Sequence, residues 1–384
     1  MSAEEKNILI VAGEASGDLH AASVAAALRR RNPAVRLRAM GGDHLRRAGA
    51  ELVVDSSRLA VVGISEVLGR LGSLIRAYRD LKKVIRSGKI DLLLLIDFPD
   101  FNLRLARAAR AVGVPVLYYI SPQVWAWRPG RTRTIARLVD RMAVIFPFEV
   151  PLYRREGLEA EFVGHPLMDV LGNPGAASPP AAGGEWKGDP LIALLPGSRH
   201  KEVNSLLPEM IRAAGIISEK KKGARFLLPL APTIRREEIE PLLPSADLRI
   251  RLVEGKTYEA VRAADLVLVA SGTATLETAV LGKPMVIVYR VSPLSYWVGR
   301  AMIRVKWIGL ANLVAGRSLV PELIQDEATG ERMAAEALRI LEDDSYRERM
   351  ILGLAGVREK LGSPGAAERV AGIAMDLLKK AHSS

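Results

Sequence analysis

Short hydrophobic segments alternate with amphipathic segments along most of this chain. In the first half, the apolar segments lie at 7–13, 36–41, 91–97, 114–121, 141–147 and 161–165. In the second half, they recur at 191–198, 224–231, 248–255, 266–272 and 284–291. Strands that are apolar on both faces and separated by helices are typical of a parallel sheet covered on both sides. The pattern therefore predicts an α/β protein.

Residues 172–190 interrupt this alternation with Gly, Pro, Ala and Ser, which predicts a linker or a loose surface loop. We therefore expect one Rossmann-like domain at 1–171 and a second at 191–345, facing a cleft. Two helical segments, roughly 329–361 and 365–381, close the chain. Residues 346–384 are expected to pack back either on the N-terminal domain or on a partner subunit. Ligands of open α/β sheets bind at the carboxyl ends of the strands, so the residues there are candidates for function.

Composition narrows the class of protein. The chain has 384 residues, of which 49% are hydrophobic and 26% charged, and this is typical of a folded protein with two domains. The absence of cysteine excludes disulfides, thiolate zinc sites and cysteine nucleophiles. The five histidines show no metal-binding spacing, so neither a metal nor a cofactor is expected. The net charge of +12 favours an anionic partner, which is nucleic acid, a phosphorylated small molecule or an acidic membrane, and the alternative is a basic surface that only contacts solvent.

A carboxylate ends the most hydrophobic of the segments. Residues 92–102 read LLLLIDFPDFN, so that Asp97 follows an apolar strand and Asp100 follows a proline. Partial burial at a strand end would raise the pKa of Asp97 and make it a better proton acceptor. Asp97 is therefore either a general base or a structural acceptor of backbone N–H groups. Asp100 is expected to cap the next helix.

The first strand runs into a turn, VAGEASGD, that contains two glycines. Gly13 and Gly17 would let the backbone approach a ligand, and Ser16 or Asp18 can cap the following helix. His20 lies close behind the turn and is either a ligand contact or a structural side chain. The turn lacks the GxGxxG pattern of dinucleotide-binding folds.

Two turns in the second half are typical of phosphate sites. LLPGSR leads from a strand into a helix, whose N-terminus forms a place for phosphate oxygens together with Arg199. ASGTATLE repeats the arrangement, with Gly272 and Thr273 at the helix start. Glu277 lies one turn into that helix, where it would accept hydrogen bonds from the vicinal hydroxyls of a ribose. The alternative is an ordinary capped helix.

Two further segments have more than one interpretation. Residues 58–70, RLAVVGISEVLGR, would either rest on a membrane and receive acyl chains or form a buried helix. The membrane interpretation depends on the apolar side chains Val61, Val62, Ile64, Val67 and Leu68. The aromatic and basic loop at 118–131 suits a sugar, a base or lipid, or else ordinary packing between domains.

Taken in order, short motifs of the chain resemble those of the lipid-A-disaccharide synthase family of lipopolysaccharide biosynthesis in Gram-negative bacteria. The motifs are VAGEASGD (11–18), GISEVLGRL (63–71), IDFPDFN (96–102), SPQVWAWR (121–128), FPFE (146–149), VGHP (163–166), LLPGSR (194–199), ASGTATLE (270–277) and NLVAGR (312–317). Each motif is weak alone, whereas the ordered set is specific.

The resemblance implies a GT-B fold, in which two Rossmann-like domains face a central cleft, and an inverting glycosyltransferase. UDP-2,3-diacylglucosamine would donate its sugar to 2,3-diacylglucosamine 1-phosphate (lipid X), giving UDP and a β-1,6-linked disaccharide 1-phosphate. Residues 1–171 would form the acceptor and lipid side, and residues 191–345 would bind UDP. The resemblance also implies a cytoplasmic protein, peripheral on the inner face of the inner membrane. A homodimer is left open.

The same resemblance implies roles for individual residues. Asp97 matches the family's general base and Arg199 its phosphate-contacting arginine, and Glu14 is a third catalytic candidate. The UDP-binding residues would be Ser198, Arg199, Gly272, Thr273, Glu277 and Asn312. The acceptor-side residues would be Ser16, Asp18, His20 and Asn102. Two residues depart from the family pattern. Phe98 stands where small residues are usual, and Ala311 stands where proline is expected.

The sequence leaves two alternatives open. Another GT-B enzyme acting on a UDP-sugar, either a UDP-GlcNAc transferase or an epimerase, would share the nucleotide motifs. A basic nucleic-acid-binding protein would explain the net charge, but the sequence contains no RRM, KH or helix-turn-helix signature.

Overall fold

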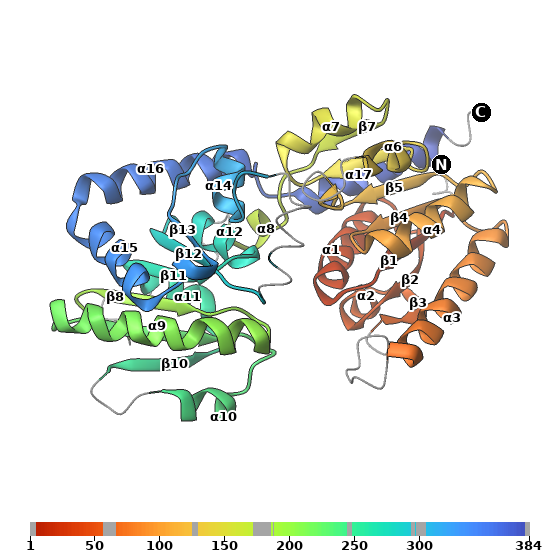
Figure 1. Ribbon diagram of the computed structural model, residues 1–384. Coiled ribbons are helices and arrows are strands. Elements are labelled where there is room, and N and C mark those ends of the chain that lie inside the picture. The colour runs from red at the N-terminus through yellow and green to blue at the C-terminus, as the bar shows by residue number, and fades with distance from the viewer. Residues whose placement is uncertain are drawn as a thin grey trace. The chain divides into compact units, whose positions relative to one another are not determined.

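The chain folds into two compact units, each built on one parallel sheet (Figure 1). The computed structural model describes residues 5–56, 67–124, 130–171, 186, 188–243, 248–292, 296 and 305–380, the side chains of 67–71 excepted. Unit 1 comprises Met1–Asp169 and Leu361–Ser384, and unit 2 comprises Val170–Lys360. Alternating strands and helices form both, as the hydrophobic pattern predicts.

Unit 1 has a seven-stranded sheet with the order β3-β2-β1-β4-β5-β6-β7. Its strands are β1 (Asn7–Ala12), β2 (Arg36–Gly41), β3 (Glu51–Asp55), β4 (Leu92–Ile96), β5 (Val116–Tyr119), β6 (Arg141–Val144) and β7 (Glu159–Phe162). The order reverses between β1 and β4, which are paired with Ala12 opposite Ile96. Ligands of open α/β sheets bind at such a reversal, beside the carboxyl ends of the two strands.

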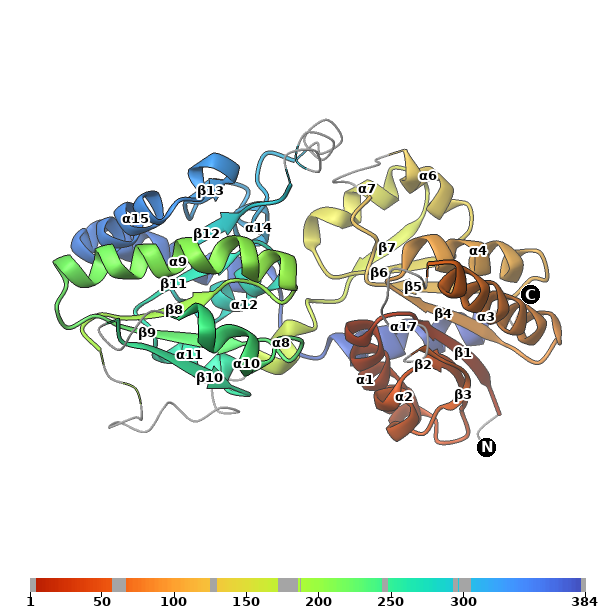
Figure 2. The same ribbon diagram turned by 60° about the horizontal axis from the view of Figure 1, so that its bottom comes forward.

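Helices cover both faces of this sheet. They are α1 (Ala15–Arg31), α2 (Asp43–Arg47), α3 (Val67–Arg86), α4 (Pro99–Arg110), α6 (Arg131–Ala136), η3 (Pro147–Glu149), α7 (Val150–Arg154) and α17 (Ala366–Lys380), whereas α8 (Leu167–Leu171) contains the boundary between the two units. Helix α1 packs against α17, whereas α3 packs against α4 on the opposite face (Figure 2). All five residues of β4 are buried, which confirms that this strand is apolar because it is covered on both sides.

Unit 2 has a six-stranded sheet with the order β10-β9-β8-β11-β12-β13. Its strands are β8 (Leu191–Leu195), β9 (Arg225–Leu230), β10 (Ile250–Glu254), β11 (Leu266–Ala270), β12 (Met285–Tyr289) and β13 (Glu322–Ile324). Its helices are α9 (His200–Lys220), α10 (Arg236–Ile239), η4 (Glu240–Leu242), α11 (Thr257–Ala263), α12 (Thr273–Val280), α14 (Leu310–Ala315), η5 (Gln325–Glu327), α15 (Gly330–Glu342) and α16 (Asp344–Lys360). Here the order reverses between β8 and β11.

The C-terminal helices divide differently from the expectation. Helices α15 and α16 replace the single segment predicted at 329–361, because Asp343 ends the first helix and its side chain accepts the backbone N–H of Tyr346 at 2.8 Å. Helix α16 belongs to unit 2, so the boundary expected at 345 falls inside it. Only α17 returns to unit 1.

Arginine 369 attaches α17 to unit 1. Its guanidinium donates to the carbonyl oxygens of Val163 and Ser363, both at 2.7 Å. The backbone N–H of His165 also donates to the carbonyl of Leu361 at 2.9 Å. Since the bonds to Val163 and from His165 join residues about two hundred positions apart, the end of the chain closes the fold of unit 1.

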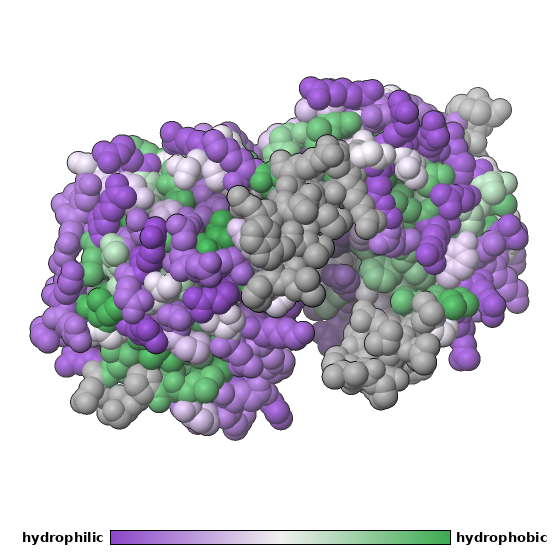
Figure 3. Space-filling view, viewed as in Figure 1, coloured by the Kyte–Doolittle hydropathy of each residue, from purple (hydrophilic) through white to green (hydrophobic). Residues whose placement is uncertain are grey.

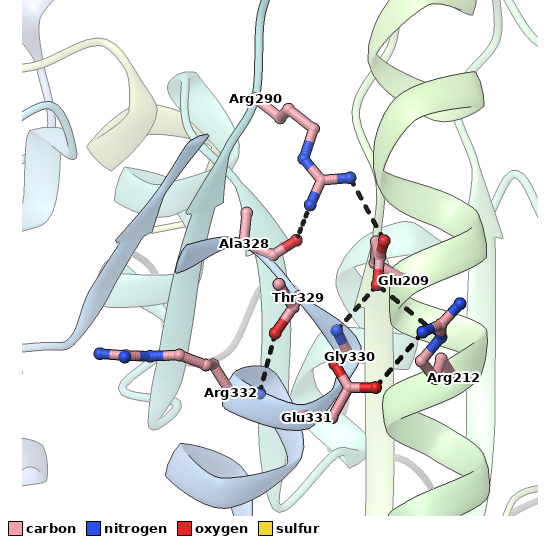
Figure 4. A network of polar contacts seen from close by, with 8 residues as sticks. All are labelled: Glu209, Arg212, Arg290, Ala328, Thr329, Gly330, Glu331 and Arg332. Atoms are coloured by element: carbon pink, nitrogen blue, oxygen red, sulfur yellow. Dashed lines mark hydrogen bonds and ion pairs between the residues drawn. The ribbon is translucent and has the colours of Figure 1, made fainter. Parts of the chain in front are cut away.

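A polar network joins α9, the end of β12 and the start of α15 (Figure 4). Glu209 accepts hydrogen bonds from Arg290 at 3.3 Å and from the backbone N–H of Gly330 at 2.9 Å. Arg290 also donates to the carbonyl oxygen of Ala328 at 2.5 Å. The side chains of Glu209 and Arg290 are only 19% and 28% exposed, so water screens their interaction weakly.

Replacing Glu209 with alanine should therefore lower the free energy of unfolding of unit 2 by about 1–3 kcal/mol, because Arg290 and the Gly330 N–H lose their partner. Differential scanning calorimetry of the full chain measures the change. Arg212→Ala is the control, since this member of the network is 62% exposed and should cost about 0–1 kcal/mol. Equal effects of the two substitutions would contradict the assignment.

Candidate active site

Asp97 lies at the carboxyl end of β4, where the strand order of unit 1 reverses. It and Phe98 have φ angles of 46° and 49°, in the left-handed region that side chains rarely adopt. Two hydrogen bonds stabilise this strained backbone conformation. The hydroxyl of buried Tyr118 and the side-chain amide of Asn102 each donate to the Asp97 carbonyl oxygen at 2.6 Å. The direction of the Asp97 side chain is thus set by buried neighbours.

The Asp97 carboxyl group is half-buried, and its pKa lies above the usual value. Burial is the main cause, the negative charge of Glu14 adds to it, and a hydrogen bond from the backbone of Phe98 opposes both. Glu14 itself is exposed and lies directly after β1. The two carboxylates come from the two strands at the reversal, which is an arrangement suited to proton transfer.

Replacing Glu14 with glutamine should move the acid limb of the pH–kcat/KM profile to lower pH. An Asp97 base works only when ionised, so activity falls as the pH drops through its raised pKa, and removal of the Glu14 charge lowers that pKa. Steady-state rates between about pH 4 and 8 measure the limb. Asp100→Asn serves as the control that leaves it in place. If the acid limb of Glu14→Gln stays at the pH of the wild type, the charge of Glu14 does not influence the titration of Asp97.

The other acceptor-side candidates differ in their access to a ligand. Ser16 is exposed, whereas Asp18 is buried and accepts backbone N–H groups of Gly42, His44 and Leu45 at 2.7–3.3 Å. Asp18 thus caps α2 rather than α1, and its carboxylate is already occupied. His20 is half-buried, and burial lowers its pKa, with an opposing effect of Asp169.

Asn102 and Asp100 also require correction. Asn102 is fully buried and donates to the carbonyl oxygens of Ile96 and Asp97, so its side-chain amide holds the end of β4. Asp100 lies in the first turn of α4, but it forms an ion pair with Arg131 and does not cap the helix.

The ring of Phe98 lies where a side chain on Gly13 would be, since a Cβ at Gly13 would come within 2.3 Å of that ring.

Unit 2 contains a pocket of about 1150 Å³ at the reversal between β8 and β11. Five of the six residues expected to bind UDP line it, and these are Ser198, Arg199, Gly272, Thr273 and Glu277. Helices α9 and α12 begin at the pocket, directed there by the two strands that precede them. The N–H groups and positive ends of two helix starts favour an anion at this cavity.

Arg199 and Glu277 provide the charged groups of this pocket. Arg199 is 81% exposed, and its guanidinium contacts Glu202 at 2.9 Å. Glu277 accepts a hydrogen bond from the hydroxyl of Tyr258 at 3.2 Å. Burial raises the pKa of Glu277, and the Tyr258 bond opposes that effect. A cation near the helix starts and a carboxylate one turn deeper suit a nucleotide's phosphates and sugar hydroxyls, respectively.

The chain is similar to known proteins along nearly its whole length. The family model for lipid-A-disaccharide synthetase matches residues 8–363. The chain is 49% identical to the lipid-A-disaccharide synthase of Geobacter metallireducens over 380 residues, which cover 99% of both chains. It is 51% identical to that of Syntrophus aciditrophicus, with 98% of both chains covered.

The chain belongs to the lipid-A-disaccharide synthetase family.

Solved structures support the GT-B fold class. A putative UDP-N-acetylglucosamine 2-epimerase from Listeria monocytogenes has a TM-score of 0.67 at 14% identity, with 98% of this chain and 97% of that chain covered. MurG of Acinetobacter baumannii has a TM-score of 0.57 at 15% identity, with 98% and 99% covered. At these identities the likeness establishes the fold alone, and the family match does not favour an epimerase.

Asn312 is the expected UDP residue that does not line the pocket. Its side chain is fully buried and accepts the backbone N–H groups of Leu319 and Val320 while donating to Glu322 at 2.8 Å. We therefore assign it a structural role, which is to tie α14 to the segment before β13. Ala311, where the family pattern predicts proline, is buried inside α14.

The membrane candidates of the segment 58–70 lie outside the residues or side chains that the structure describes. This applies to Val61, Val62 and Ile64, and to the side chains of Val67 and Leu68, although α3 begins at Val67. Among the helices that are described, none is long and apolar enough to cross a bilayer. On the face shown in Figure 3, the described surface is mostly hydrophilic, with small separate hydrophobic areas.

Sequence reasoning missed several groups at the pocket. Glu202 had a usable signal, because it is the third residue of a helix whose N-cap is Arg199, a spacing typical of a carboxylate that bonds to the helix start. Tyr258 comes from α11 and reaches Glu277 only through the fold. No group of three or more His, Asp or Glu side chains within the described ranges is arranged to hold a metal.

Proposed function

We propose that this protein transfers the 2,3-diacylglucosaminyl group from its UDP derivative to 2,3-diacylglucosamine 1-phosphate, releasing UDP and forming a lipid A disaccharide 1-phosphate. The proposal rests on the chemical groups that lie at the two positions where the strand order reverses. In a chain of the lipid-A-disaccharide synthetase family, one reversal bears a half-buried carboxylate with a raised pKa and the other bears a phosphate-type pocket.

Each residue would have a defined part in a single displacement. Asp97 would accept the proton of the acceptor's 6-hydroxyl while its oxygen attacks the anomeric carbon of the donor. The bond from that carbon to the UDP oxygen would break with inversion of configuration. Arg199 and the N-termini of α9 and α12 would stabilise the negative charge on departing UDP, and Glu277 would accept hydrogen bonds from the ribose hydroxyls.

The decisive experiment is turnover with UDP-2,3-diacylglucosamine and lipid X, with the product identified by mass spectrometry. We expect a disaccharide 1-phosphate and stoichiometric UDP. UDP-GlcNAc, which lacks the acyl chains, is the comparison donor. Turnover of UDP-GlcNAc at an equal rate, or its epimerisation without an acceptor, would support another UDP-sugar activity and contradict the proposal.

Peripheral binding to the inner face of the inner membrane is part of the same proposal. Exposed cations follow one face of α3 at helical spacing, at Arg76, Arg79, Lys83 and Arg86. Such a stripe attracts anionic lipid head groups at low salt. We expect the protein to sediment with phosphatidylglycerol vesicles, and Arg79→Glu with Lys83→Glu to reduce the bound fraction several-fold. Sedimentation that is equal with neutral vesicles would exclude this electrostatic contribution.

A further inference from the structure

Glu202 occupies two anion donors of the pocket in unit 2. One carboxylate oxygen accepts the backbone N–H of Ser198 at 3.2 Å, and the other accepts the guanidinium of Arg199 at 2.9 Å. The Glu202 side chain is only 27% exposed, whereas that of Arg199 is 81% exposed. Glu202 also lines the pocket, so that an internal anion lies at the start of α9.

The preceding turn fits around this carboxylate. Gly197 has a φ of 114°, and a Cβ there would come within 2.5 Å of a Glu202 carboxylate oxygen. Glycine thus lets the carboxylate reach the turn. Backbone N–H groups at a helix start and an arginine are also the donors that a phosphate group uses. The single N–H of Ser198 cannot serve a carboxylate and a phosphate at once, and the negative charges of these two groups repel each other beside Arg199.

We propose that Glu202 is an internal competitor of the nucleotide's diphosphate. Its carboxylate holds the Ser198 N–H and Arg199 when the pocket is free of nucleotide, and it leaves these donors when a diphosphate binds. The competition lowers affinity for UDP and assists the release of UDP as a product. This inference rests on the proposed function, because it takes the diphosphate of a nucleotide as the ligand of the pocket.

The opposite role for Glu202 makes an opposite prediction. If the carboxylate only orients Arg199 for the ligand, its removal would leave the arginine mobile and weaken binding of UDP. The sign of the change in affinity therefore decides between competition and orientation. Glutamine is the suitable replacement, since it keeps the size and hydrogen-bonding oxygen of Glu202 but removes its charge.

The experiment is isothermal titration calorimetry of the full chain with UDP and with uridine, which lacks phosphate. We expect Glu202→Gln to bind UDP about tenfold more tightly than the wild type, because the diphosphate no longer displaces a charged partner. Affinity for uridine should stay within about twofold of the wild-type value. Glu202→Ala provides a second variant, which should also bind UDP more tightly and leave the affinity for uridine within about twofold of the wild-type value. Glu219→Gln removes an equal charge from an exposed position on the same helix, and it should leave both affinities unchanged.

Three results would overturn the inference. Unchanged or weaker UDP binding by Glu202→Gln and Glu202→Ala would assign Glu202 to orientation or to folding. Tighter binding of UDP and uridine by the same factor would place the effect away from the phosphates. Failure of UDP to bind the wild type would contradict the proposed function itself, and the inference with it, whereas the first two results leave that function standing.

Discussion

Asparagine at position 97 is expected to reduce turnover by about 10²–10⁴-fold, which is the usual contribution of a positioned general base. The substitution keeps the size of the side chain. Asparagine also tolerates the left-handed backbone that Asp97 adopts, with a φ of 46°. The bonds from Tyr118 and Asn102 reach the backbone carbonyl and not the carboxylate, so the strand end should stay in place.

The measurement for Asp97→Asn is kcat with the acylated donor and lipid X, together with the Kd for UDP. We expect the loss in kcat with little change in UDP affinity, because the groups proposed to bind UDP lie in unit 2. Asp100→Asn is the matched control, since Asp100 is exposed and pairs with Arg131. Near-normal turnover by Asp97→Asn would remove Asp97 from the role of base.

Alanine at position 199 should be almost as damaging, and for a different reason. Loss of one charge-assisted contact to the leaving group typically costs about 10²–10³-fold in kcat. The loss of a charged hydrogen bond in the ground state should also weaken UDP binding by about 10–100-fold. The fold should be unaffected, since Arg199 is 81% exposed and its pair with Glu202 contributes little to stability.

Single-turnover kinetics and calorimetry with UDP test Arg199→Ala, and thermal unfolding checks that the protein is folded. Lys201→Ala is the control, because Lys201 is an exposed cation two residues away that does not line the pocket. If both substitutions weaken UDP binding equally, general positive charge and not a placed guanidinium holds the phosphates.

Most of the sheet could be predicted from the hydrophobic pattern, and the exceptions have physical causes. Strands β1, β4, β8 and β11 are buried nearly throughout, so they appear as uninterrupted apolar runs. The two strands that were missed lie at the sheet edges. Strand β3 is exposed or half-buried along its length, and β13 has only three residues. An edge strand needs a partner on one side only, and it therefore leaves a weak signal in sequence.

The residues of the candidate site likewise divide into those that the sequence could predict and those that it could not. Asp97 directly follows β4 in unit 1. In unit 2, Arg199, Gly272, Thr273 and Glu277 lie in the turns and helix starts that follow β8 and β11, and the carboxyl ends of neighbouring parallel strands share one edge of a sheet. Their grouping was thus predictable from chain position. Asp18, Asn102 and Asn312 lie in equally suggestive motifs, yet their side chains are bound to the protein's own backbone. Motif membership alone did not separate these two groups.

The sequence by itself determined the class of fold, the strands that form the centre of each sheet and the turns where charged groups emerge, because burial of apolar side chains repeats with the period of each element. Only the tertiary structure decided which polar side chains remain available to a ligand. Asp18 meets the turn before α2 some 24 residues away, and Asn312 meets the loop before β13. Such partners come from separate segments of the chain, and a local pattern carries no record of which donors the fold brings to a carboxylate or an amide.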